Sequence, residues 1–283
     1  EKYTMKRLAI VGFNEKSGIN NFLVIINELK KKMAFEFDLF LYKRSEFELY
    51  DVLNAPINFS AYDGAIAIGG DGTFLYCSRI FAGTGIPVFG VNMGNIGFNM
   101  RIEPKDFEFY LDQFLKNECS YEQLDALDVE IDGQNKIYTV LNEGVVSHGG
   151  ISRILNLKVS SYGHLIYDFC GDGMIVSTAT GSTAYNLSAG GPILHPSLHA
   201  ISLAPICPHT LTIRPYIIPI ERDVSITFGN SSVPAQITLD GQKTIQLNKC
   251  KEISFTKSNK SIIIVKTKKI FSEILKEKLG WSV

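Results

Sequence analysis

The first hundred residues alternate apolar runs with helical patterns, and this alternation constrains the fold more than any other feature of the sequence. Apolar runs cover residues 7–13, 37–42, 64–70 and 86–92. Helical spacing fills residues 20–32 and begins again near Thr73. Continuous apolar strands separated by helices are typical of a parallel sheet that is covered on both faces. We therefore predict an α/β domain over residues 1–103.

The pattern changes in the second half of the chain. After a helix that begins near Pro104, short runs of alternating polarity occupy residues 127–132, 154–160, 224–229, 236–240, 252–257 and 261–266. Short strands with turn signals between them are typical of a β-sandwich. We predict a mainly β domain over residues 104–267 and a C-terminal helix over 268–283 that ends at Gly280 and packs back on the first domain. The predicted fold class is thus a Rossmann-like α/β domain joined to a β-sandwich-like domain.

Charge and cysteine content exclude several classes of partner. The 28 Lys and Arg residues balance 29 Asp and Glu residues, so no net field favours nucleic acid or an anionic membrane. The five cysteines form no CxxC pair, no two of the five histidines have the spacing of metal ligands, and the apolar runs are too short to span a bilayer. We expect a cytoplasmic protein with small-molecule substrates and neither nucleic acid nor a membrane as partner.

The stretch "GGDGT" lies between a predicted strand and a predicted helix. Glycine permits close approach of the backbone, and a helix N-terminus attracts phosphate. This makes Gly69, Gly70, Gly72 and Thr73 candidate neighbours of a phosphate group, although a simple tight turn would have the same sequence. The stretch is neither a GxGxxG motif nor a Walker A loop.

Asp71 is the unusual residue of this stretch. A carboxylate beside a phosphate is repelled unless a metal ion or a proton-transfer role compensates. Phosphoryl transfer supplies either reason, because the acceptor hydroxyl needs an oriented base and the donor phosphates need Mg²⁺. The residue alone does not distinguish the two roles.

Two further stretches carry polar residues in apolar surroundings. In "LNEGVV" the adjacent Asn142 and Glu143 point to opposite faces of a predicted strand, so at least one of them faces a core or a cleft, unless the strand is an edge strand. In residues 171–196, Asp172 suits hydrogen bonding to ribose or amide groups, or a turn, and Ser182 is expected to cap a short helix. The "LDGQ" stretch at 239–242 predicts a hairpin turn, which needs no function to explain it.

Together with "GVNMGNIGF", "PHTLTIRP" and a closing "KLGW", these stretches in this order resemble the NAD kinase family, in its bacterial type. The likeness runs from about residue 62 to residue 281. "GGDGT" is shared with lipid kinases, whereas "STATGSTAYNLSAGGP" is specific. The resemblance implies transfer of the γ-phosphoryl group of ATP, or of polyphosphate in some members, to the 2′-hydroxyl of the adenosine ribose of NAD. It also implies a divalent cation, with Mg²⁺ favoured.

The resemblance assigns roles to particular residues. It makes Asp71 the proton acceptor and places Gly72 against the dinucleotide, in a cleft between the two domains. The other residues that it assigns to dinucleotide binding are Asn142, Glu143, Arg153, Asp172, Thr183, Ala184, Tyr185, Asn186, Leu187, Ser188 and Gln242. It further implies a homo-oligomer, dimer or tetramer, in which a neighbouring subunit completes the dinucleotide site.

The sequence departs from the family pattern at two positions. Cys170 stands where bacterial relatives often carry Arg, and Tyr76 stands where many relatives have a basic residue, with Arg79 one helical turn later as a candidate substitute. Two alternatives to an NAD kinase are a diacylglycerol-type lipid kinase and a non-catalytic dinucleotide sensor. The hydroxyl-rich loop disfavours the first, and the intact Asp71 disfavours the second.

Overall fold

The computed structural model describes residues 5–13, 18–42, 58–94, 97–150, 154–229, 234–248 and 250–281. The chain divides into two compact units, the first formed by residues 1–123 and 261–283 and the second by residues 124–260. The sequence led us to expect boundaries after residues 103 and 267. The first unit therefore takes in two segments that the sequence pattern assigned to the β domain.

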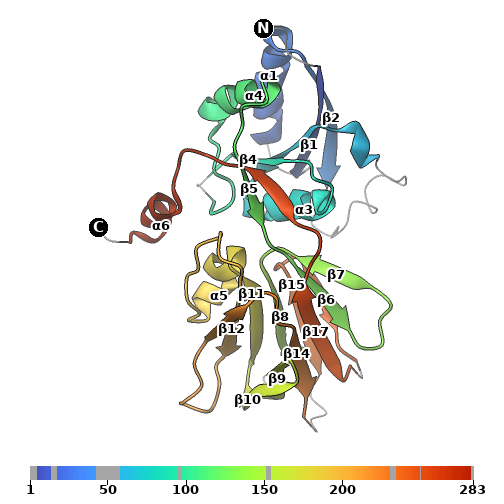
Figure 1. The fold of residues 1–283 in the computed structure, drawn as a ribbon, viewed down its shortest axis with the longest axis vertical. Helices are drawn as coiled ribbons and strands as arrows, with labels where there is room; N and C mark the ends of the chain where they lie inside the picture. The colour runs from blue at the N-terminus through green and yellow to red at the C-terminus, as the bar shows by residue number, and fades with distance from the viewer. Residues whose placement is uncertain are drawn as a thin grey trace. The chain divides into compact units, whose positions relative to one another are not determined.

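A six-stranded sheet forms the centre of the first unit, in the order β2-β1-β3-β4-β18-β5 (Figure 1). Its strands are β1 (Lys6–Phe13), β2 (Phe35–Tyr42), β3 (Gly64–Gly69), β4 (Val88–Asn92), β5 (Tyr121–Leu124) and β18 (Ile262–Val265). The pairings from β2 through β18 are all parallel. The predicted α/β architecture is confirmed.

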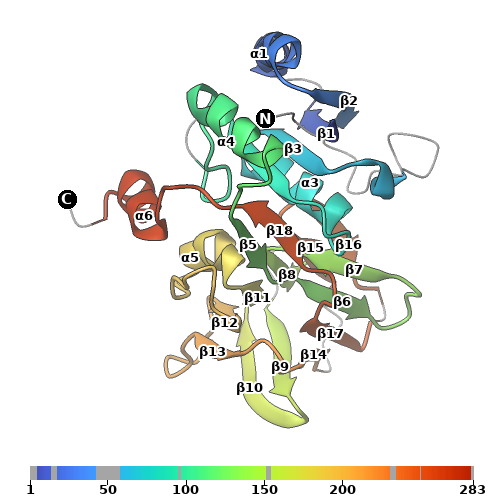
Figure 2. The ribbon, with the colours of Figure 1, turned by 45° about the horizontal axis from the view of Figure 1, so that its top comes forward.

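Helices cover both faces of this sheet (Figure 2). The helical elements of the first unit are α1 (Gly18–Lys32), η1 (Phe59–Ala61), α3 (Asp71–Phe81), η2 (Pro104–Asp106), α4 (Phe107–Leu115) and α6 (Phe271–Leu279). Helices α1 and α4 share one core with Ile10, Ile66 and Phe89 of the strands. Because side chains alternate along a strand, Ala65 and Ala67 face the other side, where α3 packs on β3.

Packing explains why the first unit extends to residue 123. Helix α4, which the sequence pattern assigned to the β domain, buries Phe107, Leu111, Phe114 and Leu115 in the core that α1 also contacts. Burial of each such side chain stabilises the fold by about 1.5–3 kcal/mol, so the four together hold α4 on this sheet.

Strand β18 is the second correction to the predicted boundaries. Its residues were assigned to the β domain, but Ile264 pairs with Val88 of β4 in the parallel sheet. The run Ile262–Val265 is continuously apolar rather than alternating. Such a run is typical of a strand that is buried on both faces of an α/β sheet.

The second unit contains two six-stranded sheets, in the orders β10-β9-β14-β17-β6-β7 and β13-β12-β11-β8-β15-β16. The first sheet comprises β6 (Leu127–Ile131), β7 (Ile137–Val140), β9 (Leu155–Ser161), β10 (His164–Gly171), β14 (Val224–Phe228) and β17 (Glu252–Lys257). The second comprises β8 (Glu143–His148), β11 (Gly173–Thr178), β12 (Ala200–Ile206), β13 (Tyr216–Pro219), β15 (Ala235–Leu239) and β16 (Lys243–Gln246). A Cβ at Gly144 of β8 would meet the ring of Phe255 of β17, so the two sheets pack face to face. The predicted sandwich is confirmed.

The C-terminal helix has the predicted end. Helix α6 is followed by Gly280 with φ of 61°, the left-handed conformation that commonly terminates helices. Helix α6 belongs to the first compact unit. In the part of the chain that the structure describes, no helix has the length and apolar character needed to cross a membrane.

Candidate active site

The "GGDGT" stretch joins β3 to α3 in the first unit. Asp71 is the first residue of α3 and follows Gly70, which has an extended backbone. Strand β1 pairs with β2 on one side and with β3 on the other, so the strand order reverses beside β3. Ligands of open α/β sheets bind outside the carboxyl ends of the strands at such a reversal. The fold thus places Asp71 where proteins of this architecture bind ligands.

Backbone N–H groups hold the carboxylate of Asp71. Its Oδ2 accepts a hydrogen bond from Phe98 N at 3.0 Å, and its Oδ1 accepts from Asn99 N and Met100 N at 3.2 Å each. A Cβ at residue 97 would collide with this carboxylate, so the close approach requires Gly97. A carboxylate offers about four lone-pair positions, and these bonds use three of them. The bonds from the described residues leave one position on Oδ2 to accept a proton or to contact a ligand.

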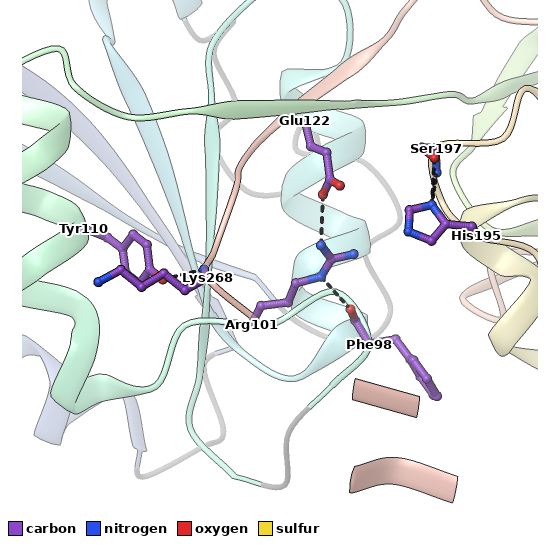
Figure 3. A network of polar contacts seen from close by, with 7 residues as sticks. All are labelled: Phe98, Arg101, Tyr110, Glu122, His195, Ser197 and Lys268. Carbon is purple, nitrogen blue, oxygen red and sulfur yellow. Dashed lines mark hydrogen bonds and ion pairs between the residues drawn. The ribbon is translucent and has the colours of Figure 1, made fainter. Parts of the chain in front are cut away.

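A buried ion pair fixes the loop that supplies these N–H groups. Figure 3 shows the guanidinium of Arg101 between the carbonyl of Phe98 and the carboxylate of Glu122, with Nε–O and Nη1–Oε2 distances of 3.1 and 2.9 Å. The Arg101 side chain is only 6% exposed. Glu122 lies on β5, so the loop is tied to the sheet. No motif of the sequence indicated this network.

The hydroxyl of Thr73 turns into the protein rather than toward a ligand. Thr73 is 5% exposed, and its Oγ1 accepts a hydrogen bond from the Tyr42 hydroxyl at 3.1 Å. Tyr76 is buried as well and stacks on Tyr42 with ring centroids 4.0 Å apart. The Thr73 side chain is therefore part of the packing of α3, and Tyr76 does not replace the basic residue of relatives. Arg79 lies half-buried in the last turn of α3.

The glycines of the stretch differ in accessibility. Gly69 is buried at the end of β3, Gly70 is half-buried, and Gly72 is exposed in the first turn of α3. Backbone at Gly70 and Gly72 can be approached by a ligand, and a side chain at either position would narrow that approach.

In the second unit, Asn142 and Glu143 lie at the start of β8 and are 6% and 3% exposed. Strand β8 is central, between β11 and β15, so the edge-strand alternative is wrong. The carbonyl of Asn142 accepts hydrogen bonds from Thr178 N at 2.9 Å and Ser177 Oγ at 3.2 Å. A Cβ at Gly181 would collide with the same carbonyl. The "STATGST" stretch therefore holds the carbonyl side of the Asn-Glu segment.

Asp240 holds the N–H side of that segment. Its Oδ1 accepts hydrogen bonds from the backbone N of Leu141, Asn142 and Glu143 at 3.1, 2.8 and 3.2 Å, and its Oδ2 accepts from Leu141 N at 3.2 Å. The "LDGQ" hairpin between β15 and β16 is confirmed, with positive φ at Asp240 and Gly241. The role of Asp240 was missed, because an Asp-Gly pair is already explained by the turn.

The side chains of Asn142 and Glu143 have unsatisfied acceptors. Asn142 Oδ1 and Glu143 Oε2 are buried and have no hydrogen-bond partner among the described residues. Burial, which is the larger cause, and the nearby charge of Asp240 together raise the pKa of Glu143 to about 8. A buried acceptor without a donor costs about 1–3 kcal/mol. The pair is suited to a ligand that presents hydrogen-bond donors, such as ribose hydroxyls or an amino group.

The "TAYNLS" loop has an inner and an outer set of residues. Asn186 is fully buried, its Nδ2 donates to the carbonyls of Ser182 and Pro192 at 3.1 Å each, and its Oδ1 accepts from Ser202 Oγ at 2.9 Å. The Asn186 side chain is thus part of the frame of the loop. On the outer side, Tyr185 is 48% exposed, so its ring is accessible for stacking.

The remaining residues of this loop are partly accessible. Thr183, Ala184 and Leu187 are half-buried, and Ser188 is exposed. Ser182 does not cap the short helix α5 (Tyr185–Ser188), whose N-cap is Ala184 after the 3₁₀ turn η3 (Thr180–Thr183). Its hydroxyl instead donates to the Ala179 carbonyl and accepts from Leu194 N.

Asp172 lies at the opposite end of the same strands. In the β11–β8 ladder, Ser177 is opposite Glu143 and Gly173 is opposite Ser147. At about 3.3 Å per residue, Asp172 is therefore roughly 16 Å from the Glu143 end. Its carboxylate accepts a hydrogen bond from the thiol of Cys207, which raises the pKa of that thiol.

Gln242 and Arg153 are the remaining two residues that the sequence assigned to the site. Gln242 is half-buried and directly follows the Asp240-Gly241 turn, at the same end of the sheet as Asn142 and Glu143. Arg153 lies outside the described residues. The structure thus brings together the Asn-Glu pair, the "STATGST" stretch and the "DGQ" turn, and it separates Asp172 from them.

Solved structures of similar fold identify the class of protein. Yeast NADH kinase complexed with NADH matches with a TM-score of 0.81 and 22% identity, covering 98% of this chain and 88% of that one. An NAD kinase from Archaeoglobus fulgidus in complex with ATP matches with a TM-score of 0.75 and 25% identity, covering 96% and 98%. The fold is that of the dinucleotide kinases.

Sequence comparison identifies the family. Residues 20–119 match the model of the ATP-NAD kinase N-terminal domain, and residues 141–267 match that of the ATP-NAD kinase C-terminal domain. The NAD kinase of Aquifex aeolicus is 34% identical over 281 residues, 98% of this chain and 100% of that relative. The NAD kinase of Treponema denticola is 37% identical over 289 residues, 98% and 97% of the two chains. The chain belongs to the NAD kinase family.

Proposed function

We propose that this protein transfers the γ-phosphoryl group of ATP to the 2′-hydroxyl of the adenosine ribose of NAD. The observation that carries the proposal is the Asp71 carboxylate, which three backbone N–H groups fix and whose Oδ2 has one position not used by the described residues. The ribose oxygen forms the new bond to the γ-phosphorus, and the bond from that phosphorus to the ADP oxygen breaks. The hydroxyl proton passes to Asp71, so the products are NADP, ADP and a proton.

The dinucleotide is held mainly by the second unit in this proposal. Asn142 Oδ1 and Glu143 Oε2 accept hydrogen bonds from donors of the ligand, which relieves their buried, unpartnered state. The exposed ring of Tyr185 stacks on a base. Thr183, Ala184, Leu187, Ser188 and Gln242 of the second unit are proposed to bind the same ligand, and so are Gly72 and Arg153.

Mg²⁺ enters as a complex with ATP rather than as a resident cofactor. Among the described residues, no group of three His, Cys, Asp or Glu side chains could hold a metal ion. Mg²⁺ commonly binds through one or two carboxylates and the substrate phosphates, so such a cluster is not needed. The chain then contributes backbone at Gly70 and Gly72 near the phosphates and, at most, the carboxylate of Asp71.

The position of Asp172 supports a homo-oligomer. Because Asp172 lies roughly 16 Å from the Glu143 end of its own β8–β11 ladder, it serves the dinucleotide site of a second copy of the chain in this proposal. The assembly is a dimer or a tetramer. The five cysteines are free thiols, which agrees with a reducing cytoplasm as the compartment.

The test is to incubate the protein with ATP, Mg²⁺ and NAD and to follow NADP with a coupled NADP-specific dehydrogenase. We expect turnover, and we expect Asp71→Asn to reduce it by about 10²- to 10⁴-fold while NAD binding is retained. Asp132→Asn, an exposed aspartate of the second unit, is the matched control. Parallel reactions with polyphosphate, NADH and a diacylglycerol define the donor and the acceptor. Turnover of the diacylglycerol alone, or NAD binding without NADP, would contradict the proposal.

A further inference from the structure

We infer that Asp240 is a positioning residue for dinucleotide binding, which fixes the backbone of Leu141, Asn142 and Glu143 so that the two polar side chains face the ligand. The inference rests on the proposed function and adds a residue to it. Asp240 touches neither the reacting atoms nor, in this inference, the dinucleotide itself.

The end of a β-ladder explains why this carboxylate is needed. Strand β15 pairs with β8 as far as Leu239 opposite Gly144. One further bond, from Asp240 N to Glu143 O at 2.9 Å, continues that pattern, and the chain then turns away into β16. Beyond this point the N–H groups of residues 141–143 donate to the Asp240 carboxylate rather than to the backbone of β15. The Asp240 side chain takes the place of the missing strand.

The three N–H groups lie in the interior, where an N–H group without an acceptor would destabilise the fold. Leu141, Asn142, Glu143 and Asp240 are between 0% and 6% exposed. An ionised carboxylate accepts hydrogen bonds that are about twice as strong as those of a neutral acceptor. One carboxylate oxygen that accepts three N–H groups therefore sets the backbone of the whole segment.

The same segment is held from its other side. Thr178 Oγ1 donates to the carbonyl of Leu141 at 2.6 Å, and Thr178 N and Ser177 Oγ donate to that of Asn142. The peptide groups are consequently satisfied by the protein. Asn142 Oδ1 and Glu143 Oε2 are buried and have no protein partner in the described structure, and they are the atoms proposed to meet the ligand.

Charge gives Asp240 a second effect on the segment. Its carboxylate acts on Glu143 in the direction that favours the protonated form, in addition to the larger effect of burial. In the described structure, Asp240 is the one charged group that acts on Glu143 in this way.

The test compares Asp240→Asn with Asp132→Asn, the same substitution in the other Asp-Gly-Gln turn. The asparagine keeps an oxygen for the three N–H groups and removes the charge, so the fold is retained. We expect KM for NAD to rise about tenfold, as the loss of charge assistance to these bonds implies, while KM for ATP changes less than about twofold. The pH dependence of KM for NAD should shift to lower pH. Asp132→Asn should change none of these quantities.

Amide hydrogen exchange at residues 141–143 gives a readout that does not depend on turnover. We expect faster exchange there in Asp240→Asn and no change in Asp132→Asn. Unchanged exchange, or an unchanged KM for NAD and pH profile in an active Asp240→Asn enzyme, would overturn the inference. An inactive wild-type protein would instead contradict the proposed function, and the exchange data would still decide whether Asp240 fixes the segment.

Discussion

Two turns of the second unit, at residues 132–134 and 240–242, have the same Asp-Gly-Gln sequence and the same backbone hydrogen bonds. In each, the aspartate N–H donates to a carbonyl of a neighbouring strand, Glu252 or Glu143, at 3.0 and 2.9 Å. In each, the glutamine N–H donates to the carbonyl of the residue before the aspartate, and the glycine has a positive φ of 78° or 63°. The two backbones differ at the aspartate, because φ is positive at Asp240 but not at Asp132. The shared sequence therefore produces the same hydrogen-bond pattern in two different turn conformations.

The surroundings of the two aspartates differ. Asp132 is exposed, and its carboxylate accepts one hydrogen bond, from Lys251 N at 3.3 Å. Asp240 is 4% exposed and accepts bonds from three consecutive N–H groups of a central strand. The turn sequence thus accounts for the shared backbone hydrogen bonds, whereas the neighbouring strand determines whether the carboxylate acquires a role.

The largest expected difference between the turns is in stability. Asp240→Ala leaves three buried N–H groups without their acceptor, at about 1–3 kcal/mol each, so we expect the free energy of unfolding to fall by several kcal/mol. Asp132→Ala should change it by less than about 0.5 kcal/mol, as is usual for an exposed site. Urea denaturation measures both values. Similar losses in the two variants would remove the distinction between the turns.

A second prediction concerns the pH dependence of stability. Between the ordinary pKa of 4.5 and the raised pKa of about 8, folded Glu143 keeps a proton that the unfolded chain releases. The free energy of unfolding therefore falls as the pH rises through this window, by at most about 1.4 kcal/mol per pH unit from this group.

The variant Glu143→Gln isolates this contribution. In this variant the free energy of unfolding should lack the part of the pH dependence that comes from Glu143. The variant should be more stable than the wild type most clearly at pH 8, as measured by urea denaturation of the ligand-free protein. Asp132→Asn should keep the wild-type dependence of stability on pH. In Asp240→Asn the pKa of folded Glu143 should be lower, so the fall in stability should stop at a lower pH. An identical slope in Glu143→Gln and the wild type would show that Glu143 titrates normally.

The smallest expected difference is between the two glycines. A Cβ at Gly133 or Gly241 would meet no atom within 4 Å, so the cost of alanine comes from the left-handed backbone alone. We expect Gly133→Ala and Gly241→Ala each to lower the free energy of unfolding by about 1 kcal/mol. Thermal unfolding of the two variants side by side measures this. A much larger loss at Gly241 would mean that its turn is held by more than local backbone geometry.

Sequence patterns predicted the features that depend on local periodicity. The strand-to-helix junction at Asp71, the strands of the sandwich and the helix end at Gly280 each follow from spacing within a short window. Strand β18 was assigned to the wrong unit, because its alternative partners lie far away in the sequence and only its continuous apolar run indicated the parallel sheet.

The direction of a polar side chain was harder to predict than its presence. Thr73, Ser182 and Asn186 have the residue types of a ligand site, but each uses its side chain within the protein, toward Tyr42, Leu194 and Ser202. Asp240 is the opposite case. Its residue type predicts only a turn, but in the fold its carboxylate accepts hydrogen bonds from the backbone of residues 141–143. Both outcomes depend on which strands become neighbours, and a short window of sequence does not contain that information.

The position of β18 has a consequence for the order in which the chain can fold during synthesis. Strand β18 lies between β4 and β5 in the sheet, although residues 124–260 separate it from β5 in the sequence. Strand β5 therefore cannot join the sheet until the ribosome has released the residues of β18. The second unit is continuous in sequence, so it can fold first. The unit that carries Asp71 is therefore completed after the second unit, once β18 has emerged.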